Sequence, residues 1–143
     1  MSGKLFTRRR DGRVEVRLND AGRAAVREVF GHVVAAERDP EHDWHVALRG
    51  PITPASDEDD PLSTLTRQRD IASNAELALM TLREQYLTDG EAWAWFCTLQ
   101  VALRSLALVH GILSDEKIES CDPAVLEEIR TIQHLLFDLS GCL

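Results

Sequence analysis

The densest group of potential metal ligands lies at residues 41–45, where the sequence reads Glu-His-Asp-Trp-His. Imidazole and carboxylate groups suit zinc or iron, and His42 and His45 would share one face if the segment were helical. The spacing matches no established metal-binding signature, and the segment has no hydrophobic periodicity. We therefore expect a solvated acidic loop with no metal. A metal-dependent enzyme that uses the two histidines is a third hypothesis, behind two non-enzymatic ones.

No other group of residues indicates catalysis. The chain has no Gly-x-Ser-x-Gly motif and no glycine-rich phosphate loop, and an isolated Ser or Cys needs an adjacent base to become a nucleophile. His110 falls in the apolar stripe of a predicted helix, which favours a hydrogen-bonded core histidine over a catalytic one. The sequence predicts a protein that is not an enzyme and that needs no cofactor.

The cysteines permit a geometric argument. Cys121 and Cys142 flank a predicted helix that separates them by about 25 Å at about 1.5 Å per residue, and a disulfide needs Cα atoms within about 7 Å. If that helix packs antiparallel on the central one, Cys97 lies opposite a level near Leu139, so Cys97 and Cys142 are the only intrachain pair that remains. Two interpretations stay open. Either Cys97 is a small buried apolar residue and Cys142 a free thiol at the frayed C-terminus, or a mobile Cys142 acts as a redox latch.

Charge is divided unevenly along the chain. The net charge is −8, yet residues 1–18 hold six basic and two acidic residues, a local charge of +4, which leaves −12 on the remainder. An acidic body repels nucleic acid, whereas Arg8, Arg9 and Arg10 could contact phosphate. The balance favours protein partners, with a solvated hairpin as the simplest account of the basic arm.

One long helix, predicted at residues 89–113, organises the rest of the chain. Thr88 and Glu91 are placed to form a capping box at its start. The apolar residues fall on two faces, which is typical of a helix that packs between neighbours or contacts a second subunit.

The second apolar face of this helix is the predicted interaction site. Trp93, Val101 and Leu108 exceed what one core face needs, so we assign them to a homodimer contact, with Arg104 beside them. Arg104 is also a charge in the middle of the helix, which argues against a membrane span.

Turn and capping signals define the other elements. Asp11-Gly12 suits a type I′ turn, which predicts a β-hairpin at residues 5–18. Gly31 lies inside a predicted helix and suggests close packing at that point. A shift in the apolar stripe predicts a break near residues 70–73, with Ser73 opening a new helix. The predicted helices span about 20–37, 61–70, 73–87, 89–113 and 123–139, and an irregular acidic insert covers 38–60.

These elements predict a single domain over residues 1–143. The fold class is mainly α: a helical bundle around a long central helix, with a small N-terminal β-hairpin. The composition, 44% hydrophobic and 28% charged, is that of an ordinary globular protein. The N-terminus lacks an apolar signal core, and three cysteines do not suit a secreted disulfide framework, so we expect a cytoplasmic protein with no membrane association.

The layout of an Arg-rich hairpin, an acidic insert and a Leu-Thr-x-x-Glu-Ala-Trp-x-Trp helix resembles the actinobacterial domain-of-unknown-function family 2017. The residues that carry the resemblance are Phe6, Arg8, Gly12, Val14, Leu18, Leu87, Thr88, Glu91, Ala92, Trp95, Leu99, Leu106 and Gly111. The resemblance implies a mainly helical cytoplasmic protein without known catalysis. It also implies an association with the Clp protease machinery, because members are often encoded near the Clp adaptor, and redox-responsive regulation of transcription.

Two functional hypotheses follow. The first is a non-enzymatic regulatory or protein-interaction module that forms a homodimer. The alternative is a redox-responsive transcriptional regulator that contacts DNA through the basic N-terminal arm and switches through Cys97 and Cys142.

Overall fold

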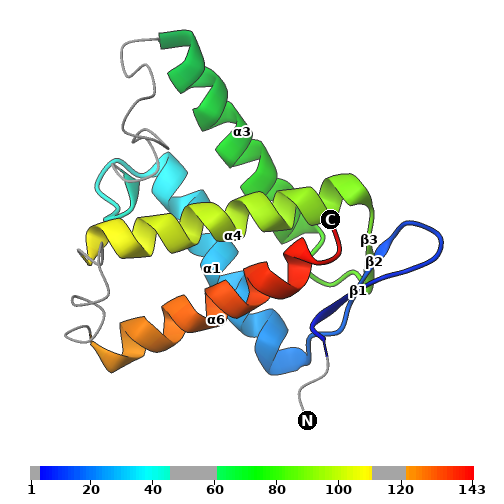
Figure 1. The fold of residues 1–143 in the computed structure, drawn as a ribbon. Helices are drawn as coiled ribbons and strands as arrows, with labels where there is room; N and C mark the ends of the chain where they lie inside the picture. Colours follow the sequence, from blue (N-terminus) through cyan, green and yellow to red (C-terminus); the bar gives the residue numbers. More distant parts are fainter. Residues whose placement is uncertain (1–3, 46–60, 111–121) are drawn as a thin grey trace.

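The computed structural model describes residues 4–45, 61–110 and 122–143. This part of the chain is mainly helical with a small antiparallel sheet at its N-terminal end, as the sequence predicted (Figure 1). The elements in chain order are β1 (Phe6–Arg8), β2 (Val14–Val16), α1 (Asp20–Arg38), α3 (Pro61–Met80), β3 (Tyr86–Leu87), α4 (Asp89–Val109) and α6 (Pro123–Ser140).

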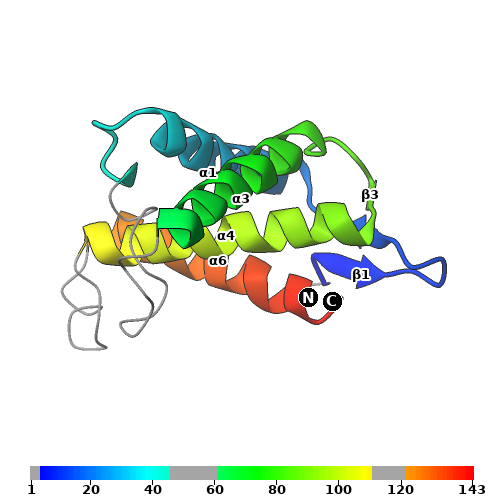
Figure 2. The ribbon, with the colours of Figure 1, turned by 90° about the horizontal axis from the view of Figure 1, so that it is seen from above.

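Helix α4 is the centre of the bundle. It packs against α1, α3 and α6, and Figure 2 shows α1 and α3 on one side of it and α6 on the other. Among the described residues, α4 alone is long and apolar enough to span a membrane, a property that the core helix of a globular protein shares. Its capping box is confirmed: the Thr88 amide donates to Glu91 Oε1 at 2.8 Å, and the Glu91 amide donates to Thr88 Oγ1 at 3.3 Å.

Trp95 of α4 connects four elements in the core. Its fully buried ring makes edge-to-face contacts with Phe6 of β1 and Phe30 of α1, with ring centroids 6.1 and 5.1 Å away. Its indole Nε1 donates to Thr81 Oγ1 at 2.8 Å, directly after α3. A buried indole N–H needs a hydrogen-bond acceptor, so this contact satisfies the N–H group and also fixes the orientation of the ring.

The hairpin forms, but its turn is not type I′. A type I′ turn needs positive φ at both central residues, and in the described chain only Gly12 has a positive φ, of 92°. Arg9 and Arg13 close the loop, since the Arg9 amide donates to Arg13 O at 2.8 Å and the Gly12 amide donates to Arg9 O at 3.1 Å. The result is a three-residue loop that ends in a left-handed glycine, which spares Asp11 the strained conformation.

The predicted helices 61–70 and 73–87 were wrong in two respects. A single helix, α3, runs through the expected break, and it ends at Met80 rather than at residue 87. Tyr86 and Leu87 instead form β3, which pairs with β2 in the register Val14↔Leu87. The edge of β2 offers hydrogen bonds and full burial for Leu87, and this tertiary gain outweighs the local helical pattern.

Two smaller expectations need correction. A Cβ added at Gly31 would meet no atom within 4 Å, so close packing does not explain this glycine. His110 is an exposed C-cap rather than a core histidine, because α4 ends at Val109. Residues 111–113 of the predicted central helix and 46–60 of the predicted insert lie outside the described residues.

Candidate interaction surface

Helix α4 carries large apolar groups outside its buried face. Trp93 is 51% exposed, and its ring makes an edge-to-face contact with the half-buried ring of Phe96, with centroids 5.5 Å apart. The buried residues of α4, among them Trp95 and Leu99, occupy the other side of the helix. Trp93 is therefore not needed to fill the core of the monomer.

Helix α6 runs antiparallel to α4 and adds a second exposed ring. The alignment of the two helices is set by Arg8, whose Nη1 donates to Asp89 Oδ1 at the start of α4 at 2.8 Å and to the Cys142 carbonyl after α6 at 2.9 Å. Trp93 follows Asp89 by one helical turn, and Phe137 precedes Cys142 by five residues, so the two rings lie at similar levels. Phe137 is 77% exposed, opposite the buried stripe of α6.

We call the three aromatic residues Trp93, Phe96 and Phe137 the α4/α6 surface. Helix α1 and helix α3 lie on the opposite side of the α4–α6 pair (Figure 2), and no described residue buries Trp93 or Phe137. Exposed aromatic rings on neighbouring helices are a common mark of a protein-interaction site.

The sequence-predicted interaction residues divide into two groups. Trp93 and Leu108 are exposed, at 51% and 41%. Val101 is partly buried against the core, and Arg104 is half-buried and already engaged in a contact within the protein. Phe137 was missed, although its position outside the apolar stripe of the last helix was a signal that it points outward.

Two of the three arginines proposed for DNA contact are engaged within the protein. Arg8 ties the hairpin to α4 and α6 as described, and its hydrogen-bonded ion pair with Asp89 raises its pKa. Arg9 lies 3.5 Å from Glu15, whereas Arg10 is exposed at the hairpin loop. The guanidinium of Arg13 also lies over the ring of Tyr86, 4.6 Å from its centroid. Three of these four arginines thus make contacts within the protein, which weakens the case for a DNA-binding arm.

Cys97 and Cys142 are free thiols in different surroundings. Cys97 is half-buried, and burial together with the charge of Asp70 on α3 raises its pKa. Cys142 is buried directly after α6. Burial raises its pKa, and the opposing effect of the nearby Lys4 charge is smaller. A raised thiol pKa reduces the thiolate fraction that reacts with oxidants and disulfides. This environment suits two unreactive thiols better than a redox latch.

In the segment that holds His42 and His45, Trp44 and His45 pack against α1, whereas Glu41 and Asp43 are exposed to solvent. Trp44 is buried, with its ring centroid 5.3 Å from that of His32 on α1. The His45 ring is also buried, and its Nδ1 lies 2.6 Å from the Ala36 carbonyl. The solvated loop predicted here was therefore wrong at these two positions, because Trp44 gains burial against α1 while its acidic neighbours stay in solvent.

His42 and His45 both make hydrogen-bond contacts within the protein. His42 Nδ1 accepts a hydrogen bond from the Trp44 amide at 3.1 Å. Within residues 4–45, 61–110 and 122–143, no three His, Cys, Asp or Glu side chains are grouped in a way that could hold a metal ion.

Comparison with protein-family models, with curated proteins and with solved structures finds no match to this chain.

Proposed function

We propose that this protein is a non-enzymatic interaction module that forms a homodimer through the α4/α6 surface. The observation that carries the proposal is the exposure of two aromatic rings, 51% for Trp93 and 77% for Phe137, at similar levels on neighbouring helices. Such rings contribute most of the binding energy of many protein interfaces when a partner buries them.

A twofold dimer suits this surface because a twofold interface joins the same patch on both copies. Trp93 of one copy can then pack against Phe137 of the other, and the same contact recurs across the axis. The helices present these rings on rigid backbone, so little conformational entropy is lost when they are buried.

The apolar area at this surface is small, so the dimer that we propose is a reversible one. An aromatic side chain buries about 200 Å², so the exposed parts of Trp93 and Phe137 amount to roughly 250 Å² per copy. At about 25 cal/mol per Å², the four rings of a dimer contribute on the order of 12 kcal/mol. Association costs about 4–15 kcal/mol before any other contact is counted. The net charge of −8 on each copy also opposes association, so added salt should strengthen it.

Sedimentation velocity over a wide range of protein concentration tests this proposal. We expect the wild-type protein to shift from monomer to dimer as concentration rises, and a variant with Trp93→Glu and Phe137→Glu to stay monomeric. Met80→Glu is the control for a glutamate in place of an exposed apolar residue elsewhere, because Met80 is 80% exposed but lies on α3. A wild-type protein that remains monomeric throughout, or a double variant that still dimerises, would contradict the proposal.

A further inference from the structure

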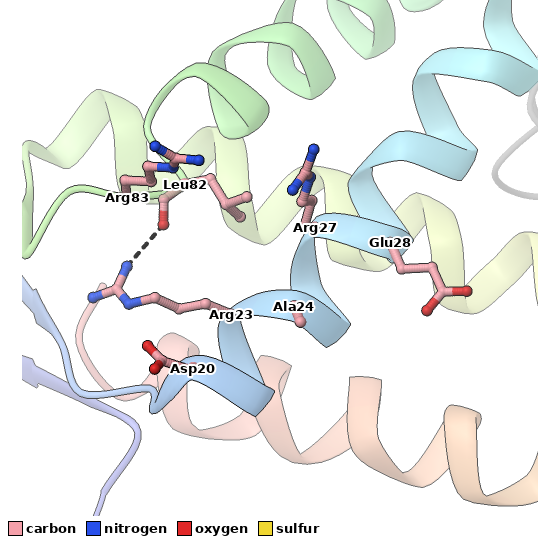
Figure 3. A pocket seen from close by; sticks show the side chains of 7 residues that line it. All are labelled: Asp20, Arg23, Ala24, Arg27, Glu28, Leu82 and Arg83. Atoms are coloured by element: carbon pink, nitrogen blue, oxygen red, sulfur yellow. Dashed lines mark hydrogen bonds between the residues drawn. The ribbon is translucent and has the colours of Figure 1, made fainter.

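A pocket of about 700 Å³ lies between α1 and the turn that follows α3. Figure 3 shows that two of its arginines come from successive turns of α1 and the third from the turn after α3. These are Arg23, Arg27 and Arg83. Three arginines lining one pocket are unexpected in a protein whose net charge is −8, because the protein as a whole repels anions.

Arg23 is held in place by backbone carbonyls. Its Nη1 donates to Leu82 O at 2.7 Å and to Glu84 O at 3.1 Å, and its Nη2 donates to Val16 O at 3.4 Å. These contacts fix the side chain but leave its positive charge without a paired carboxylate. Arg23 therefore supplies a fixed positive field at the pocket wall.

Arg27 and Arg83 supply exposed hydrogen-bond donors. Both side chains are exposed, and in Figure 3 they extend on either side of the Leu82 side chain. Among the ion pairs of the described residues, none includes Arg27 or Arg83. A guanidinium fork binds carboxylate or phosphate oxygens through two parallel hydrogen bonds, so both arginines can bind an anion that enters the pocket.

The carboxylates at the edges of the pocket limit the size of that anion. Asp20 and Glu28 lie at the two ends of the α1 wall, eight residues and about 12 Å apart along the helix axis. A long polyanion that ran along α1 would meet a negative charge at each end. A compact anion with more than one negative charge fits between them, above the apolar Ala24 and Leu82.

We propose that this pocket binds a small phosphorylated molecule, with Arg27 and Arg83 donating to its phosphate oxygens and Arg23 adding fixed positive charge. A phosphate or diphosphate group carries two or more negative charges on clustered oxygens, which matches three guanidinium groups better than a single carboxylate does. The volume of about 700 Å³ is that of pockets for small molecules.

Isothermal titration calorimetry with inorganic pyrophosphate, at constant ionic strength, tests the proposal. We expect binding to the wild-type protein and a loss of affinity of roughly tenfold or more for each of Arg27→Gln and Arg83→Gln. The charge-matched control is Arg130→Gln, which removes one positive charge, as each test variant does, from an exposed arginine on α6. This control should bind pyrophosphate as the wild type does.

Three outcomes would overturn the proposal. The first is wild-type protein that does not bind pyrophosphate. The second is an equal loss of affinity in the charge-matched control, which would show a general effect of net charge. The third is a short DNA duplex that binds more tightly than pyrophosphate and loses that binding when Arg27 and Arg83 are replaced, which would make the site a polyanion surface.

Discussion

Replacing Thr81 with Val tests how the core is held together. Thr81 Oγ1 accepts the hydrogen bond of Trp95 Nε1 at 2.8 Å and donates to the Leu77 carbonyl at 2.9 Å. Valine has nearly the same shape but no hydroxyl, so the change removes the acceptor and keeps the packing. The Trp95 ring is fully buried, and its N–H would then have no partner in the core.

The expected cost comes mainly from that N–H group. The Leu77 carbonyl keeps the hydrogen bond from the Thr81 amide, at 3.1 Å, and so stays satisfied after the substitution. A buried donor without a partner costs about 1–3 kcal/mol. We therefore expect Thr81→Val to lower the free energy of unfolding by about 1–3 kcal/mol, or the melting temperature by roughly 3–5 °C per kcal/mol for a chain of this size.

A double-mutant cycle with Trp95→Phe separates this effect from packing. Phenylalanine has no N–H, so Thr81→Val should change the stability of the Trp95→Phe protein by less than about 0.5 kcal/mol. Urea titrations of dilute protein, followed by circular dichroism, measure all four free energies of unfolding. If Thr81→Val is neutral in the wild type, or costs the same in both backgrounds, the hydrogen bond does not stabilise the core as argued.

Gly31→Ala should raise the free energy of unfolding by about 1 kcal/mol, because its Cβ meets no atom within 4 Å. Gly12→Ala should lower the free energy of unfolding by about 1–2 kcal/mol, because φ is 92° there. Urea titrations measure both changes, and a change of the opposite sign would refute either prediction. Burial raises the thiol pKa of Cys97 and Cys142, so the folded protein favours the protonated thiols. Their contribution to the free energy of unfolding is full below the ordinary thiol pKa and is lost as pH rises through the raised pKa values. In a Cys121→Ala background, alkaline pH should thus lower the urea midpoint of unfolding and speed the alkylation of the two thiols. Alkylation at neutral pH as fast as that of free cysteine would contradict this.

Capping residues and long apolar stripes made much of the helical architecture predictable. Thr88 and Glu91 start α4 where the capping box was expected, and Asp122 accepts from the Ala124 amide at the start of α6. These signals are local, because a side chain within three residues satisfies a backbone group at the helix end. The mainly α fold with an N-terminal hairpin followed from them.

Contacts between residues distant in sequence could not be predicted in the same way. The β3 strand exists because Leu87 pairs with Val14 of β2, and nothing in the residues around Tyr86 marks a strand. Trp44 was assigned to a solvated loop because its neighbours are acidic, but helix α1 offers it a packing surface. In both cases a tertiary surface supplied burial that local sequence does not report.

The candidate sites show the same division. The sequence by itself determined that the central helix has more apolar groups than one core face needs, since helical periodicity assigns Trp93 and Leu108 to a second face. Only the tertiary structure decided which of those groups stay exposed, because Val101 packs partly against the core while α6 brings Phe137 to the level of Trp93. The arginine pocket, too, arises from the packing of α1 against the turn after α3, because it joins residues about 60 positions apart that share no sequence motif.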